Sequence, residues 1–191
     1  MIQKFDVSET DLAGAYLIQP FCATDERGSL IKDYNIEVLN DFGINHELKE
    51  IFYTVSHKGV IRAIHFQEIK QQPKLVRCIS GHIYDVIVDL RKESSTFGKW
   101  QAFELTGDNM KSLLIPARFG HGYLVIEDSI VSYKCAEVFC AEGDTGIKWN
   151  DDEIGINWPL ERIGGKRRLI ISEKDEKLQS FDEYKKIYNS I

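Results

Sequence analysis

The stretch IYDVIVDL, residues 83–90, determines how the middle of the chain is interpreted. Side chains of a β-strand alternate between the two faces of a sheet. One face of this strand therefore carries only apolar or aromatic groups, at positions 84, 86, 88 and 90, while the other mixes isoleucines with Asp85 and Asp89. A buried carboxylate is costly unless it is paired, so we expect Asp85 to have a cationic partner such as Arg62 or Lys74. That pair could be structural or part of a site.

Similar strand-like runs lie on both sides of this stretch, between positions 50 and 149, and turn-forming residues separate them. They cover residues 51–55, 60–66, 75–79, 100–105, 112–115, 122–126 and 130–139. The connections between the runs are too short for the helix that joins parallel strands. Regular spacing of this kind is typical of a β-sandwich or a jelly roll, so we predict an all-β fold.

Helices are expected only near the two ends of the chain. A short helix is predicted at residues 36–42, and a second follows position 171, where Leu178, Phe181, Tyr184 and Tyr188 recur at helical spacing. Ser172-Glu-Lys-Asp175 has the spacing of a helix capping box. No repeat, low-complexity tract or linker interrupts the sequence, so residues 1–191 are taken as a single domain.

Composition excludes several classes of function. The 24 Lys and Arg against 30 Asp and Glu give a formal net charge of −6, and no basic run offers a surface for nucleic acid. No apolar stretch reaches the length of a membrane span, and acidic residues occupy the place of a signal peptide, so we expect a cytoplasmic protein. Four cysteines lack C-x-x-C spacing and lie in strand-like segments, which predicts buried, reduced thiols.

Polar groups gather around His65, the best candidate for a base because its ordinary pKa lies near neutrality. A histidine within a strand is also commonly a structural residue. Regular alternation places Arg62 and His65 on opposite faces, so the strand must bulge if both line one cavity. A metal site of the His-x-His type is not expected, because Gln67 stands where the second imidazole would be. With His121 the barrel offers two imidazoles, one fewer than the protein ligands of a typical catalytic zinc.

Three further residues have a structural and a functional interpretation. His121 lies between two glycines, in a segment that either simply reverses the chain or brings the backbone close to a ligand. Tyr133 could be a core residue with a satisfied hydroxyl. Asp175 is explained by helix capping alone.

Taken together, the motifs resemble the dTDP-4-dehydrorhamnose 3,5-epimerase family of nucleotide-sugar enzymes, from about position 18 to position 175. They occur in order and at compatible spacing: Arg27-Gly28, Gly59-Val-Ile-Arg62-Ala-Ile-His65-Phe-Gln67, Lys74-Leu-Val-Arg77-Cys, Gly81-x-x-x-Asp85-Val-x-Val-Asp89-Leu-Arg91, Pro116-x-x-x-x-His121-Gly122, Tyr133-Lys134, Trp149-Asn-Asp151 and Ser172-x-Lys-Asp175.

The resemblance implies a cupin-type jelly roll, a homodimer that shares sheet strands, and no cofactor. It also implies inversion of the carbons that flank a 4-keto group in a nucleotide-linked sugar. His65 matches the family's catalytic base, Asp175 the carboxylate that orients it, Tyr133 the proton donor on the opposite face and Lys74 the group at the enolate oxygen. Matching positions for substrate binding are Arg62, Gln67, Asp85, His121 and, for the nucleotide, Arg27.

Several positions depart from the family pattern. The common Arg-Gly-Leu-His is Arg62-Ala-Ile-His65 here, and the family's Gln-x-Asn appears as Glu50-Ile-Phe52. The others are Lys32, Phe139 and Arg118, where glutamate, tyrosine and glycine are usual. Two other functions remain open at this stage: a 3,4-ketoisomerase with the same base, and a catalytically silent module that binds sugar nucleotides.

Overall fold

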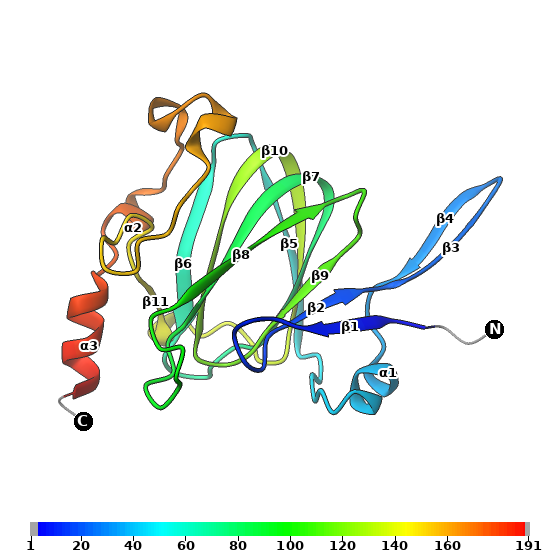
Figure 1. Ribbon diagram of the computed structural model, residues 1–191, viewed down its shortest axis with the longest axis horizontal. Coiled ribbons are helices and arrows are strands. Elements are labelled where there is room, and N and C mark those ends of the chain that lie inside the picture. Colours follow the sequence, from blue (N-terminus) through cyan, green and yellow to red (C-terminus); the bar gives the residue numbers. More distant parts are fainter. Residues whose placement is uncertain (1–3, 190–191) are drawn as a thin grey trace.

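Two long antiparallel strands form the centre of the molecule (Figure 1), a computed structural model that describes residues 4–189. β7 (Lys74–Asp89) and β10 (Phe119–Cys135) pair along almost their whole length. Both are about three times as long as an ordinary strand, and irregularities interrupt their register between Val125 and Val131. Each strand therefore bends and contributes to two walls of a β-roll.

Gly81 marks the bend of β7. Its φ of +84° is a left-handed conformation, and a Cβ at this position would lie 2.1 Å from the carbonyl oxygen of Asp128. Before the bend β7 pairs with β9 (Ser112–Ile115), and after it with β8 (Trp100–Thr106). The predicted runs 75–79 and 82–90 are thus the two halves of one strand.

β10 divides in the same way. Its first half pairs with β6 (Ile61–Gln67) and its second half with β5 (Glu50–Ser56). A short strand, β11 (Asp144–Gly146), pairs with β6 at the edge of the sheet. The structure confirms the all-β jelly-roll prediction, but the predicted strand 130–139 is too long, because β10 ends at Cys135.

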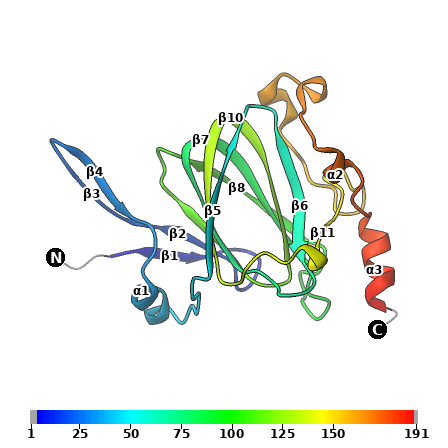
Figure 2. The same ribbon diagram turned by 180° about the vertical axis from the view of Figure 1, so that it is seen from behind.

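Four short strands near the N-terminus were not predicted. β1 (Asp6–Glu9) and β2 (Tyr16–Gln19) extend the sheet beyond β9, while β3 (Phe21–Asp25) and β4 (Gly28–Lys32) form a separate two-stranded hairpin. The hairpin projects away from the roll in two opposite views (Figures 1 and 2). These strands have only four or five residues, and β1, β3 and β4 are largely exposed, so they lack a long apolar alternation.

The helices lie near the chain ends, as predicted. α1 (Ile36–Asp41) begins at Asn35, whose side chain accepts hydrogen bonds from two backbone amides. α2 (Glu173–Glu176) begins at Ser172, and the Asp175 backbone amide donates to the Ser172 hydroxyl at 3.1 Å, which confirms the cap. α3 (Phe181–Asn189) follows, and the side chain of Tyr188 lies outside the described residues. Three 3-10 turns complete the elements: Ala141–Gly143, Leu160–Ile163 and Lys166–Arg168.

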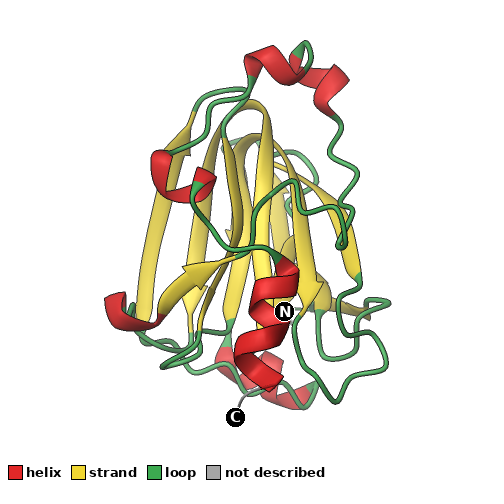
Figure 3. Ribbon diagram, turned by 90° about the vertical axis from the view of Figure 1, so that its left-hand side faces the viewer, coloured by secondary structure: helices red, strands yellow, loops and turns green. Residues whose placement is uncertain are grey.

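The two faces of β7 pack into two separate cores, as the alternation at 83–90 predicts. Ile83 and Ile87 point into the roll, where they join one apolar cluster. Val86 and Val88 belong to the other cluster, together with Phe181 of α3. The C-terminal helix lies across the sheet in the view of Figure 3. Among the described residues no helix has the length and apolar character needed to cross a bilayer.

Candidate active site

A cavity of about 220 Å³ opens inside the roll, between β5, β6, β7 and β10. Five of the residues singled out from the sequence line it together: Arg62, His65, Lys74, His121 and Tyr133. Gln67 also forms part of the wall, and the remaining lining residues are Phe52, Thr54, Phe66, Gln72, Tyr123, Phe139 and Asp144.

His65 is paired with Asp175, which approaches it from α2 behind β6. The Nε2 atom of His65 lies 2.9 Å from Oδ1 of Asp175, and the Asp175 side chain is only 5% exposed. Burial alone would raise the pKa of Asp175, but the hydrogen bond and charge of His65, with the bond from Ser172, lower it. Asp175 therefore takes part in the cap of α2 through its backbone amide and is hydrogen-bonded to His65 through its carboxylate.

A bulge in β6 brings Arg62 and His65 into the same cavity. His65 pairs with His121 of β10 and Arg62 pairs with Tyr123, so three steps on β6 match two on β10. The bulge presses against Gly122, where a Cβ would lie 2.5 Å from the Cβ of Ala63. The predicted irregularity is confirmed. Gly122 accommodates the neighbouring strand and not a ligand.

Tyr133 stands on β10 with its ring held from two sides. The Phe52 ring is stacked on it, with centroids 4.5 Å apart and an interplanar angle of 11°. His121 meets the Tyr133 ring edge-on at 5.9 Å. Burial, with smaller effects from Tyr123 and the Asp85 carboxylate, raises the pKa of Tyr133 well above its usual range. The phenol is therefore protonated at neutral pH.

Lys74, the first residue of β7, supplies a cation to the same cavity. Burial lowers the pKa of Lys74, and the nearby Cys135, Asp144 and Asp85 oppose that shift. Positive charge in a partly dehydrated cavity acts strongly on an anion that forms beside it.

Asp85 is hydrogen-bonded to His121 and not, as expected, to Arg62; the other expected partner, Lys74, acts on Asp85 through its charge. Oδ2 of Asp85 lies 2.9 Å from Nε2 of His121, and the Asp85 side chain is fully buried. Burial raises the pKa of Asp85, while the charge and hydrogen bond of His121 act in the opposite direction. Arg62 instead donates to the hydroxyl of Ser56 at 3.2 Å.

Two predicted substrate contacts have other roles within this chain. The Gln67 amide donates to the carbonyls of Lys70 and Val138 and accepts from the Cys140 backbone amide, so it fastens two loops beside the cavity. Arg27 lies in the tight turn of the β3–β4 hairpin, where its side chain is 86% exposed and paired with Asp25. The structure does not bring Arg27 to the cavity of its own chain.

Sequence reasoning missed the contribution of β5 to the site. Phe52 and Thr54 face the cavity, and the Thr54 hydroxyl lies 2.8 Å from the hydroxyl of the buried Tyr123. Alternation within residues 50–56 places Phe52 and Thr54 on one face of the strand. Only the pairing of β5 with β10 shows that this is the face that carries Tyr133.

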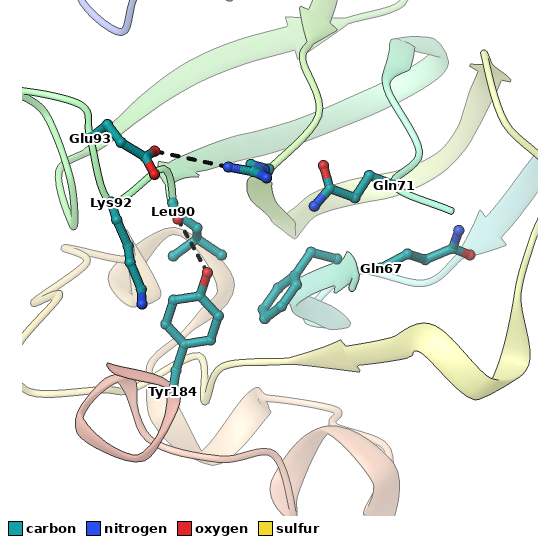
Figure 4. Close-up of a pocket in the computed structure, with 8 residues that line it drawn as sticks. Gln67, Gln71, Leu90, Lys92, Glu93 and Tyr184 are labelled. Atoms are coloured by element: carbon teal, nitrogen blue, oxygen red, sulfur yellow. Dashed lines mark hydrogen bonds and ion pairs between the residues drawn. The ribbon is translucent and has the colours of Figure 1, made fainter. Parts of the chain in front are cut away.

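A second cavity, of about 260 Å³, shares Phe66 and Gln67 with the lining of the first. Figure 4 shows Gln67 together with other residues that line this second cavity. It is bordered by an ion pair between Glu93 and Arg118 at 3.9 Å and by Tyr184, whose hydroxyl donates to the carbonyl of Leu90. His65 and Tyr133 line the first cavity and not this one. Over residues 4–189 no three His, Cys, Asp or Glu side chains are grouped as a metal would require.

Both the sequence and the fold are similar to those of known proteins. A family model described as dTDP-4-dehydrorhamnose 3,5-epimerase matches residues 9–183. The chain is 44% identical over 173 residues to an enzyme of that name from Methanothermobacter thermautotrophicus, covering 90% of this chain and 92% of that one. A crystal structure of the Bacillus anthracis enzyme, with TDP and PPi bound, superimposes with a TM-score of 0.87 at 39% identity, covering 93% of this chain and all of that one.

The structural likeness extends to an enzyme with a bound sugar nucleotide. dTDP-6-deoxy-D-glucose-3,5-epimerase from Legionella pneumophila, in complex with dTDP-4-keto-L-rhamnose, superimposes with a TM-score of 0.88 at 30% identity, and 94% of each chain is covered. The roll described above is thus the cupin-type jelly roll of these epimerases.

Proposed function

Because this chain belongs to the dTDP-4-dehydrorhamnose 3,5-epimerase family of isomerases, we propose that it inverts C3, C5 or both of a nucleoside-diphosphate 4-keto-6-deoxyhexose. One observation carries the mechanism. A histidine oriented by a carboxylate and a buried, protonated tyrosine line the same cavity. Inversion at a carbon beside a ketone requires both groups, since the proton leaves from one face and returns to the other.

His65 is the base in this proposal. Its Nε2 is hydrogen-bonded to Asp175, which selects the tautomer with the proton on Nε2 and leaves Nδ1 to accept a proton. When Nδ1 takes the proton from carbon, the imidazolium is stabilised by the Asp175 carboxylate, which stays ionised because its pKa is lowered. The electrons of the broken C–H bond pass to the ketone oxygen as an enolate.

Lys74 and Tyr133 complete the reaction. Lys74 lines the cavity and places positive charge at the enolate oxygen. Tyr133 then gives its phenolic proton to the carbon from the face opposite His65, and a new C–H bond forms as the enolate collapses to the ketone. Loss of a proton from His65 and gain of one by Tyr133, through solvent, returns the site to its starting state.

Substrate binding uses the remaining polar groups. Arg62 and the His121–Asp85 pair line or support the cavity and are assigned to the sugar and the diphosphate, for which an arginine is well suited. Arg27 is assigned to the nucleotide of a neighbouring subunit in a homodimer. The proposal of a homodimer is supported by the projecting β3–β4 hairpin and by the outward face of β5, where Ile51, Tyr53 and Val55 are all more than 60% exposed.

The test is solvent exchange in D₂O with a dTDP-linked 4-keto-6-deoxyhexose, followed by NMR. The expected result is deuterium at C3 or C5 in a product with inverted configuration. Replacing the base, as in His65→Ala, should slow both exchange and inversion at least about 100-fold. A 3-keto product would indicate a 3,4-ketoisomerase, and binding without exchange would indicate a silent module. Either result would overturn the proposal.

A further inference from the structure

The acid of the proposed reaction, Tyr133, is in contact with an apolar aromatic side chain, Phe52. Phe52 of β5 and Tyr133 of β10 are directly opposite each other in the antiparallel register. Cross-strand neighbours on one face of a sheet are close enough for their side chains to touch. Here the two rings lie nearly parallel, 4.5 Å apart.

A second aromatic contact on the Tyr133 ring comes from His121. His121 meets it at an interplanar angle of 71°, and His121 is fixed in turn by its hydrogen bond to the buried Asp85. Phe52 belongs to β5. This strand pairs with β10 alone and is not part of the main strand order of the sheet. Phe52 is 38% exposed, so it forms the boundary between the phenol and the open part of the cavity.

We infer that Phe52 is a positioning residue for the acid. By stacking on Tyr133 it supports one face of the ring, and in this way it helps to hold the phenolic oxygen on the face of the sugar opposite His65. This inference rests on the proposed role of Tyr133 as the proton donor. Small displacements of a reacting group can cost up to about 100-fold in rate, so an apolar contact of this kind matters to catalysis.

Loss of the contact with Phe52 should affect only the return of the proton from Tyr133 and not its removal by His65. Removal of the proton needs His65, Asp175 and Lys74, whereas the ring that stacks on Phe52 is that of Tyr133. The enolate that results has two fates. Once the imidazolium of His65 has exchanged its proton with D₂O, it returns a deuteron to the enolate, which gives labelled substrate of unchanged configuration. Alternatively, the deuterated phenol of Tyr133 delivers a deuteron from the other face, which gives inverted product. Loosening Tyr133 therefore shifts the partition toward exchange without inversion.

The experiment compares Phe52→Leu with Phe52→Tyr in D₂O. Leucine keeps an apolar side chain without a ring face, whereas tyrosine keeps the stack. We expect Phe52→Leu to raise the ratio of labelled, uninverted substrate to inverted product about three- to tenfold, the contribution of one aromatic pair. Phe52→Tyr should restore the parental ratio. Phe42→Leu, at an exposed phenylalanine beyond α1, is the matched control and should leave the ratio unchanged.

Each other outcome is decisive. An unchanged ratio in Phe52→Leu, or a change in KM alone, would show that Phe52 is only a wall of the cavity, and the inference would be wrong. Tyr133→Phe separates this from failure of the proposed function: that variant must lose inversion while retaining exchange. If it retains inversion, Tyr133 is not the acid. Exchange catalysed by His65 reports at the same time that each variant is folded.

Discussion

At the scale of single residues, Asp175 joins local structure to chemistry. Its position as the third residue after the Ser172 cap directs its carboxylate toward His65, and the same backbone amide completes the cap. A short helix of four residues has little stability of its own, so the cap and the packing of α2 against β6 set the carboxylate in place. The Ser172-x-x-Asp175 spacing therefore sets both the cap of α2 and the hydrogen bond to His65.

Replacing Asp175 by asparagine tests the orienting role. The amide keeps the shape of the carboxylate but favours the wrong imidazole tautomer and gives no charge to the imidazolium, so deuterium exchange should fall at least about 100-fold. Ser172→Ala removes only the side-chain half of the cap and should cost about 1 kcal/mol of stability, with a much smaller loss of exchange. Equal losses of exchange in the two variants would mean that Asp175 acts only through the helix.

At the scale of elements, alternation and spacing predicted the strands that have a long apolar face. They did not predict the features that depend on which strands pair and in which register. The partner of Asp85 is His121, 36 positions away and on the adjacent strand, and no local pattern distinguishes it from Arg62 or Lys74. The bulge in β6 was predictable only on the condition that Arg62 and His65 share a cavity. The role of Phe52 depends on the register of β5 against β10, which the sequence does not display.

The end of β7 gives a prediction for stability. Asp89 is fully buried and holds the turn toward β8, where Arg91, Ser94 and Thr96 donate hydrogen bonds to it. Burial alone would raise the pKa of Asp89, but these hydrogen bonds outweigh it and lower the pKa to about 2. A lowered carboxyl pKa stabilises the folded state above the unfolded pKa of about 4, and the contribution is lost as the pH falls toward 2.

We therefore expect Asp89→Asn to destabilise the protein by about 2 kcal/mol at pH 7, measured by urea unfolding. The difference between the variant and the parent should narrow as the pH is lowered from about 4 toward 2, since the parental carboxylate becomes protonated over that range. A difference that does not change with pH would assign the loss to packing and not to the ionised carboxylate.

At the scale of the whole molecule, two exposed features call for a second copy of the chain. A two-stranded hairpin such as β3–β4 is only marginally stable alone, yet it projects from the roll with Leu30 more than half exposed (Figure 2). The outward face of β5 is apolar, and its inward face holds Tyr133. In the proposed homodimer, formed through these surfaces, Arg27 of one subunit would reach the cavity of the other.

Mixing two impaired variants tests that arrangement. Arg27→Ala should have a raised KM with all its acid–base groups intact, and Tyr133→Phe should lack inversion with Arg27 intact. After the two are unfolded and refolded together, half of the dimers are mixed, and each has one complete site if Arg27 serves the partner. Inversion at low substrate concentration should then rise to about a quarter of the parental value. If Arg27 serves its own chain, no complete site forms, and the mixture will be no more active than the average of the two variants measured separately.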